Sequence, residues 1–236
     1  MTAPVTVAID GPSGSGKSTI SRRLAAAEGL AYLDTGAMYR AATWWCRRQD
    51  VELTDTAAVA AATEVMPLDM GVDPGDPTIT CDGVDITAAI RLSEISSVVS
   101  AVATNLDVRA QLRERQRAII AAERQPGGHS GGRGIVAEGR DITTVVAPDA
   151  DVRILLTADE AARLARRARE LHGTVDDQAI AATRDEVVGR DAQDSTVSTF
   201  LTAADGVVTI DSSALDIDQT LAVVRRVVAQ ARQEEQ

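Results

Sequence analysis

Short apolar stretches recur along the chain, and segments with helical spacing of their apolar positions lie between or after them. The apolar stretches are rich in Val, Ile, Leu and Ala, which is typical of buried strands. They lie at residues 5–10, 30–34, 134–138, 151–157 and 206–211. The clearest helical segments lie at residues 37–49, 108–124, 159–171, 176–190 and 217–233. This alternation predicts an α/β fold, in which helices flank a parallel sheet and ligands bind at the carboxyl ends of the strands.

Two segments interrupt the alternation. Residues 66–86 contain three prolines and two short β-like stretches, with Asp82-Gly83 between them as a hairpin turn. They predict a small β insertion in the α/β core. Residues 125–134 are rich in glycine and predict a flexible surface loop, to which the sequence assigns no function.

The first predicted strand leads directly into a glycine-rich turn. Residues 11–18 read Gly-Pro-Ser-Gly-Ser-Gly-Lys-Ser and satisfy the phosphate-loop pattern G-x-x-x-x-G-K-[ST] in full. The strand before the turn and the helix after it let backbone N–H groups point at phosphate oxygens. A hydroxyl at the end of the pattern is available to Mg²⁺. The residues expected to bind ATP here are Gly11, Pro12, Ser13, Gly14, Ser15, Gly16, Lys17, Ser18 and Thr19.

Lys17 is the only lysine of the chain, and every other basic side chain is an arginine. A guanidinium group is too bulky to lie along a tight glycine turn, whereas an ammonium group on a thin stem reaches between phosphates. The exception therefore stands where the shape of lysine is required.

Polar residues also follow the second predicted strand. The acid Asp34, the hydroxyl of Thr35 and Gly36 stand at the end of that strand, and the basic Arg40 lies on the helix after it. Together they predict a second anion site that faces the first. Tyr39 fits either core packing or a wall against a base. For Trp44 and Trp45, packing of the helix against the sheet is the favoured interpretation.

A third polar cluster, Glu138-Gly139-Arg140-Asp141, follows the third predicted strand. Glu138 stands where strand-end acids of phosphate-loop enzymes hold Mg²⁺ or its waters. A salt-bridged surface turn is the alternative, but the place at the carboxyl edge of the sheet favours function.

Arginines gather on the two predicted helices between residues 159 and 190. Arg163, Arg166 and Arg167 recur at helical spacing, so two or three of them share a face. A solvated salt-bridge network explains some of these arginines. It does not explain why both helices converge on the loop around Gly173, which resembles a lid.

Composition restricts the partners. The chain has 236 residues and 44% hydrophobic residues, which suits one domain with a substantial core. Its net charge of −11 argues against nucleic acids and anionic membranes, and no apolar stretch reaches membrane-spanning length. Two isolated cysteines fit a reducing compartment without a structural disulfide. We expect a soluble, cytoplasmic, monomeric protein whose partners are small-molecule nucleotides.

The chain resembles the cytidylate kinase family, bacterial nucleoside monophosphate kinases that phosphorylate CMP and dCMP. The matching segments span nearly the whole chain: residues 10–17, the specific run Asp-Thr-Gly-Ala-Met-Tyr-Arg at residues 34–40, and residues 108–109, 139–141, 144–150 and 190–191. The resemblance implies one phosphate-loop kinase domain over residues 1–236. It also implies a monophosphate-binding insertion at about residues 66–100 and a helical lid at about residues 160–195.

The resemblance also implies roles for individual residues. The residues implied to bind CMP are Thr35, Tyr39, Arg40, Ser100, Arg109, Arg140, Asp141, Arg190 and Asp194, of which Ser100, Arg109 and Asp141 would read the cytosine. Arg163 and Arg167 of the lid would close over ATP. The residues implied in catalysis are Lys17, Arg140 and Arg190, with Mg²⁺ at Ser18 and Glu138.

Three departures from the family pattern stand out. Val197 occupies a place where the family usually has another arginine, so the grip of the lid on CMP would be weaker or supplied elsewhere. Thr143 stands where the family commonly has a glycine, so the sequence does not predict the backbone conformation after Asp141. The loop at residues 125–134 is longer than usual.

Other functions remain as alternatives. A kinase for another small acceptor, such as shikimate or a different monophosphate, shares the phosphate loop. A nucleotide-dependent switch would need an Asn-Lys-x-Asp motif, which a single lysine at position 17 excludes, and a transport ATPase would need a Leu-Ser-Gly-Gly-Gln segment, which is absent. His129 and His172 lie in loop-like contexts and are interpreted as surface residues.

Overall fold

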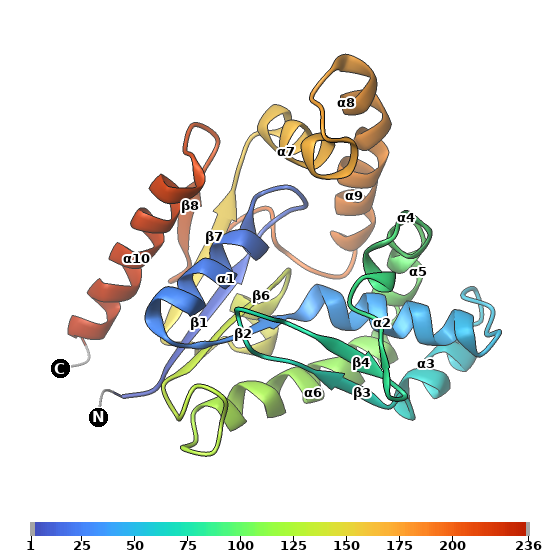
Figure 1. Ribbon diagram of the computed structural model, residues 1–236, viewed down its shortest axis with the longest axis horizontal. Helices are drawn as coiled ribbons and strands as arrows, with labels where there is room; N and C mark the ends of the chain where they lie inside the picture. The colour runs from blue at the N-terminus through green and yellow to red at the C-terminus, as the bar shows by residue number, and fades with distance from the viewer. Residues whose placement is uncertain (1–2, 235–236) are drawn as a thin grey trace.

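The computed structural model describes residues 3–234, without the side chains of residues 185, 186 and 234. Its centre is a five-stranded parallel sheet with the strand order β2-β6-β1-β7-β8. The strands are β1 (Val5–Asp10), β2 (Ala31–Asp34), β6 (Gly134–Gly139), β7 (Val152–Thr157) and β8 (Val208–Asp211). Each one lies where the sequence predicts a strand, and the predicted α/β fold with flanking helices is confirmed (Figure 1).

Helices cover both faces of this sheet. On one face, α1 (Lys17–Glu28) and α10 (Ile217–Glu234) pack over Val7 and Ile9 of β1. On the other, α2 (Thr35–Arg48) and α6 (Leu106–Glu123) pack over Ala8. Because successive side chains of a strand point to opposite faces, one apolar strand supplies both hydrophobic cores.

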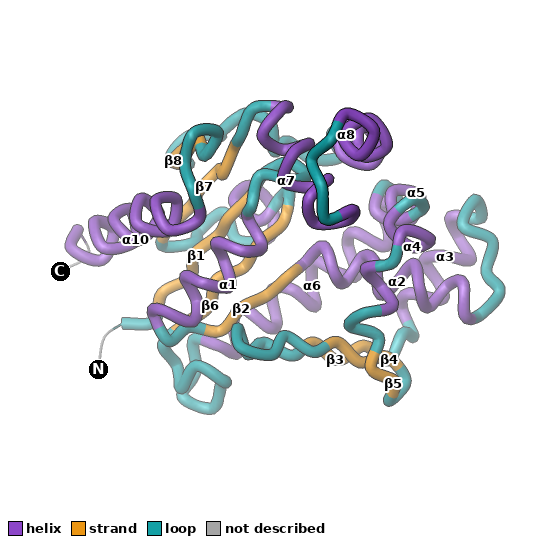
Figure 2. Tube along the Cα trace, turned by 45° about the horizontal axis from the view of Figure 1, so that its top comes forward, coloured by secondary structure: helices purple, strands orange, loops and turns teal. Residues whose placement is uncertain are grey.

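The interruption at residues 66–86 forms a separate antiparallel sheet with the order β3-β4-β5. Its strands are β3 (Leu68–Met70), β4 (Ile79–Cys81) and β5 (Val84–Asp85), and they lie to one side of the main sheet (Figure 2). The sequence predicts two β-like stretches, and the structure has three strands because β3 also pairs with β4. Asp82 and Gly83 have φ values of 52° and 70°, as a tight hairpin turn requires.

Short helices connect these parts. The sequence did not single out α3 (Thr56–Glu64), a 3₁₀ turn (Ala89–Arg91) or α4 (Ser93–Ser96), whereas α5 (Val99–Ala103) lies where Ser100 was expected in a helical region. The Asp55 carboxylate caps α3 by accepting from the N–H of Ala58. None of the helices within residues 3–234 is long and apolar enough to cross a membrane.

The predicted lid consists of α7 (Glu160–His172), α8 (Asp177–Arg184) and α9 (Arg190–Asp194). It lies above the carboxyl ends of the central strands in Figure 1. The sequence predicts one helix over residues 176–190, but the structure widens into a π-helical turn at Asp185–Gly189. This wider turn changes the direction in which the side chains of α9 point, relative to α8.

The glycine-rich segment at residues 125–134 forms a surface loop that is fastened at its base. The carboxylate of Glu123 accepts hydrogen bonds from the backbone N–H groups of His129 and Ser130, at 2.9 and 2.8 Å. His129 and, at the end of α7, His172 are exposed, as predicted.

Candidate functional site

A pocket of 1460 Å³ opens at the carboxyl ends of the central strands. The phosphate loop forms its floor, and the lid, the start of α2 and the end of β6 form its walls. Pockets for one small ligand have volumes of about 300 to 1000 Å³. This pocket therefore has room for two nucleotides, which a transfer between nucleotides requires.

The phosphate loop takes its shape from glycines with left-handed backbone angles. Gly16 has a φ of 90° and immediately precedes α1, so the loop turns directly into the helix N-terminus. A side chain on Gly14 (φ 75°) would lie 2.6 Å from the backbone oxygen of Arg163, so the lid approaches the loop closely here.

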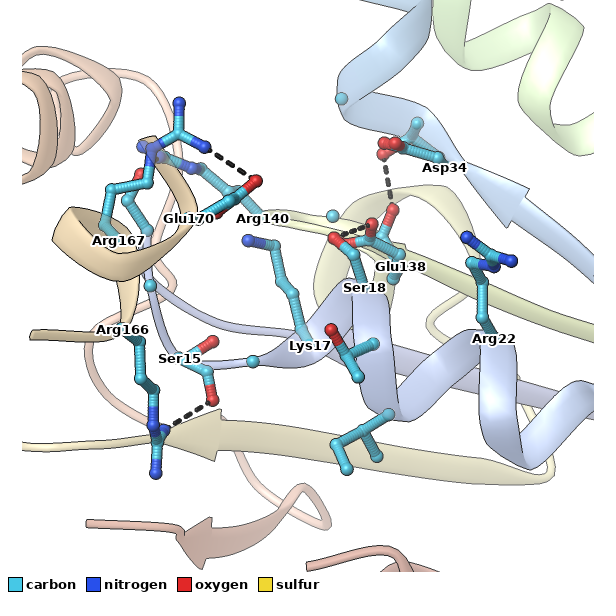
Figure 3. A pocket seen from close by; sticks show the side chains of 18 of the residues that line it. Ser15, Lys17, Ser18, Arg22, Asp34, Glu138, Arg140, Arg166, Arg167 and Glu170 are labelled. Atoms are coloured by element: carbon cyan, nitrogen blue, oxygen red, sulfur yellow. Dashed lines mark hydrogen bonds and ion pairs between the residues drawn. The ribbon is translucent and has the colours of Figure 1, made fainter. Parts of the chain in front are cut away.

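Lys17 is half-buried, and its side chain points into the centre of the pocket. Figure 3 shows it between Arg140 and Glu170 on one side and Ser18 and Glu138 on the other. Burial lowers the pKa of Lys17, and the charge of Glu138 opposes this effect. The ammonium group is thus partly removed from water, in a place where a nearby anion would stabilise its charge.

Ser18 and Glu138 meet beside Lys17, although 120 residues separate them. The Ser18 hydroxyl donates to Oε1 of Glu138 at 2.6 Å. Burial, followed by the charge of Asp34 in the paired strand, raises the pKa of Glu138 to about 7, while Lys17 lowers it. A hydroxyl and a carboxylate are hard oxygen donors of the kind that suits Mg²⁺, so this pair fits the expected ion.

The sequence did not predict the second partner of Glu138. The buried hydroxyl of Tyr32 donates to the same carboxylate oxygen at 3.2 Å. Burial, the charge of Glu138 and this hydrogen bond hold the pKa of Tyr32 well above its usual value, so the tyrosine stays a donor. The position of Tyr32 in β2, one strand away from Glu138, is visible only in the sheet.

Three arginines of the predicted site come together on the opposite wall. Burial, and then the charges of Arg40 and Arg140, lowers the pKa of Arg190 to about 9. Nε of Arg40 is buried and has no hydrogen-bond partner among the described residues. Guanidinium groups that repel one another in a buried pocket are stabilised by an anion with several oxygens, such as a phosphate.

Arg140 is held by residues from several parts of the chain. Its Nη2 donates to the hydroxyl of Ser13 at 2.7 Å and pairs with Asp191 at 2.9 Å, and its Nη1 pairs with Asp194. Its guanidinium also lies 4.6 Å from the ring centre of Phe200, the only phenylalanine in the chain. Sequence reasoning did not identify Phe200, because nothing in its neighbourhood marks it.

A buried polar pair also lines the pocket. Nη2 of Arg109 donates to Oδ2 of Asp141 at 2.6 Å, and both side chains are buried. The Arg109 guanidinium lies 5.8 Å from the ring centre of Tyr39, which also lines the pocket, so Tyr39 combines packing with a wall position. Ser100 instead donates to Asp194 of the lid, at 3.2 Å.

The lid arginines approach the phosphate loop from α7. Arg163 donates to the backbone oxygen of Ser13 at 2.9 Å, and Arg166 donates to that of Ser15 at 3.2 Å. Arg167 lines the pocket and pairs with Glu170 at 2.9 Å. Arg166 was not among the expected ATP ligands, although its helical spacing with Arg163 and Arg167 was a signal.

Two other expectations concern side chains outside the phosphate site. Trp45 is buried in the core, with its Nε1 donating to the backbone oxygen of Ala62 in α3, and the half-buried Trp44 packs against the same core. Val197 is half-buried in the turn after α9. Because valine carries no charge, a weaker hold of the lid on CMP, or one supplied by another arginine, stays a prediction.

The backbone after Asp141 is fixed by Asp10, at the end of β1. The buried Asp10 carboxylate accepts from the N–H of Ile142 at 2.9 Å and from both the N–H and the hydroxyl of Thr143, at 2.8 and 2.6 Å. Thr143 therefore contributes a hydrogen bond that glycine lacks. The result is a π-helical turn at Ile142–Val146, which anchors Arg140 and Asp141.

Asp10 should make folding stability depend on pH. Burial raises its pKa from 3.8 to about 6, so between these values the folded chain binds a proton that the unfolded chain has lost. Stability from this group is therefore highest below pH 4 and falls by about 3 kcal/mol as the pH rises through 6. The side chain of Asp10→Asn does not titrate in this range. In urea unfolding, the free energy of unfolding of the variant relative to that of the parent should therefore be higher at pH 7 than at pH 4.5. If the variant and the parent differ in unfolding free energy by the same amount at both pH values, this prediction is wrong.

Comparisons with known proteins agree with this geometry. The sequence model of a family described as "Cytidylate kinase" matches residues 7–233. A cytidylate kinase of Streptomyces avermitilis is 45% identical over 97% of this chain and 94% of its own length, and one of Streptomyces coelicolor is 48% identical over 98% and 96%. One of Nocardia farcinica is 48% identical over 96% of this chain and 94% of its own length. With matches of this extent, and with the phosphate loop facing an arginine cluster, the chain belongs to the cytidylate kinase family.

Proposed function

We propose that this chain transfers the γ-phosphoryl group of ATP to CMP or dCMP and releases ADP with CDP or dCDP. The observation that carries the proposal is a single pocket in which the phosphate loop faces a cluster of three arginines, with a buried Arg109–Asp141 pair beyond them. The loop suits a donor polyphosphate, the arginines an acceptor phosphate, and the buried pair a polar base.

The donor lies along the phosphate loop. Backbone N–H groups of residues 14–18 and the ammonium of Lys17 bind its phosphates, and Arg163 and Arg167 of the lid close over them. Ser18 and Glu138 hold Mg²⁺ directly or through its waters. When bound, Mg²⁺ neutralises charge on the donor phosphate oxygens.

The acceptor lies against the opposite wall. Its phosphate binds Thr35, Arg40, Arg140 and Arg190, because planar guanidinium groups match phosphate oxygens in pairs. Its base meets Ser100, Arg109 and Asp141, with Tyr39 beside it. The contacts to the phosphate and to the base together orient the acceptor for attack. Asp194, on the lid, contributes a further contact to the acceptor.

Phosphoryl transfer in this pocket requires no general base. An acceptor phosphate oxygen, already ionised near neutral pH, forms a bond to the γ-phosphorus while the bond to the bridging oxygen of ADP breaks. Lys17, Arg140 and Arg190 neutralise charge on the phosphoryl group as it moves, so alignment and electrostatics supply the acceleration. Closure of the lid excludes water, which would otherwise hydrolyse ATP.

The domain division belongs to the same proposal. Residues 1–236 form one kinase domain, residues of about 66–100 bind the monophosphate, and residues of about 160–195 form the lid. The chain acts on small-molecule nucleotides in the cytoplasm, without nucleic acid or membrane, which its net charge of −11 supports. It acts as a monomer, and a mass by light scattering well above 24.8 kDa would contradict this.

A coupled assay of ADP formation tests the proposal. ATP and Mg²⁺ are supplied with CMP, dCMP, UMP, AMP or shikimate as the acceptor. CMP, dCMP or both should be the preferred acceptors, and the nucleoside diphosphate should form in equal amount with ADP. Preferred use of AMP or shikimate would reject the assignment.

Neither histidine should matter for turnover. The acceptor oxygen is already anionic, so proton abstraction is unnecessary, and both side chains are exposed. The double variant His129→Gln with His172→Gln should retain kcat within a few-fold of the parent in the coupled assay. A collapse of activity in a folded variant would show that a base takes part.

A further inference from the structure

Asp191 is a buried carboxylate with no role in the mechanism described above. It lies on α9 of the lid, next to Arg190, and is only 5% exposed. Its Oδ1 accepts from the backbone N–H of Ser13 at 3.0 Å, which links the lid to the tip of the phosphate loop across 178 residues. A buried charge in this place needs strong partners, because removing a carboxylate from water is unfavourable.

Two arginines supply those partners. Nη2 of Arg140, from the end of β6, lies 2.9 Å from Oδ1 of Asp191. Nη1 of Arg163, from α7, lies 2.5 Å from Oδ2. One carboxylate therefore joins four segments that are separate in the sequence: the phosphate loop, the end of β6 and two helices of the lid.

These same residues engage every polar group of Ser13. Its N–H donates to Asp191, its carbonyl oxygen accepts from Arg163 at 2.9 Å, and its hydroxyl accepts from Arg140 at 2.7 Å. The backbone of Arg163 also lies so near Gly14 that a Cβ there would be 2.6 Å from the Arg163 oxygen. The tip of the loop is thus clamped from the lid side by residues that Asp191 holds together.

We propose that Asp191 is a positioning residue, which fastens the lid to the tip of the phosphate loop and so places Arg140 and Arg163 when the lid closes. This inference rests on the proposed function for its kinetic part only. Asp191 contacts other protein groups and not the substrates. Its replacement should therefore slow the chemical step and admit water to the pocket, and it should change the binding of the two substrates much less.

Hydrogen–deuterium exchange of the chain without added nucleotide tests the contact itself. Asp191→Asn keeps the size of the side chain but removes its charge. Peptides that cover residues 10–18 and 160–195 should exchange at least several-fold faster in this variant than in the parent. Asp177→Asn is the matched control, because Asp177 is an exposed carboxylate on α8 of the same lid, and it should leave both peptides unchanged.

Unchanged exchange in Asp191→Asn, or equal acceleration in Asp177→Asn, would overturn the proposal. If Asp191→Asn does not fold, Asp191→Glu is measured instead, because it keeps the charge. Its longer side chain fails to hold Ser13 and Arg163 together, so the same two peptides should exchange faster. Parent-like exchange in Asp191→Glu would overturn the proposal too.

Kinetics separate positioning from general support of the fold. Asp191→Asn should lower kcat by roughly 10- to 100-fold, as expected for small misplacements of reacting groups, with KM for both substrates within a few-fold. The ratio of ATP hydrolysis without acceptor to phosphoryl transfer should rise. Equal loss of both activities would assign Asp191 to stability alone. If the parent uses no cytidine monophosphate, the proposed function fails, while the exchange experiment still decides the role of Asp191.

Discussion

Replacing Lys17 by alanine should lower kcat by at least about 100-fold, the largest effect that we expect from any single change on the donor side. The reason is the loss of a positive charge that points into the centre of the pocket beside the phosphate loop. Burial already disfavours this charge in the protein alone, as the lowered pKa of Lys17 indicates, and phosphates bound beside it would stabilise the charge.

Lys17→Arg is the informative companion. It preserves the charge but introduces a planar group that is too bulky for the loop, so it should not restore activity. Initial rates in the coupled assay, with thermal unfolding to confirm the fold, measure both variants. Near-normal turnover in folded Lys17→Ala would remove the phosphate loop from the mechanism.

The parent enzyme should prefer CMP over UMP by a factor of roughly 10⁴ in kcat/KM, as the most favourable hydrogen-bonded sites do. Cytosine carries an exocyclic amine and an acceptor at N3, and uracil presents the opposite pattern at these edges. In the proposed pose, Asp141 would accept from the amine, while Arg109 and Ser100 would donate. Because Arg109 and Asp141 are buried, the wrong base leaves polar groups opposed or unpaired.

Asp141→Asn tests which residue carries this preference. The variant should lose kcat/KM for CMP far more than for UMP, because an amide presents a donor where cytosine also donates. Asp151→Asn is a suitable control, since Asp151 also pairs with an arginine, Arg124 at 2.8 Å, but does not line the pocket. Equal use of both substrates by the parent would reject cytidylate as the acceptor, and equal losses in Asp141→Asn would assign Asp141 to general positioning.

The sequence alone was sufficient for the sheet and for the phosphate loop. Strands such as β1 and β6 are continuous apolar runs, and the loop is a contiguous pattern whose glycines fix the backbone locally. The polar groups at strand ends could also be grouped, because parallel strands bring their carboxyl ends to one edge. Local patterns of this kind can be interpreted without knowledge of the fold.

The sequence was weaker where several elements compete for one segment. The helix predicted over residues 176–190 has a π-helical turn at Asp185–Gly189, and α3 was not identified. In both cases tertiary packing determines the backbone conformation. The spacing of apolar residues does not show that one helical turn contains an extra residue, and it does not show which alanine-rich segment forms a helix.

Only the tertiary structure decided how the site residues are held. Asp10 fastens Thr143, Tyr32 reaches Glu138, and Phe200 lies against Arg140, in each case over more than fifty residues of sequence. These contacts depend on strand order, on the register that pairs β2 with β6, and on the place of the lid above the sheet. The motifs specify which chemical groups are present because they are local, whereas orientation and protonation depend on burial and on partners that the folded chain alone brings together.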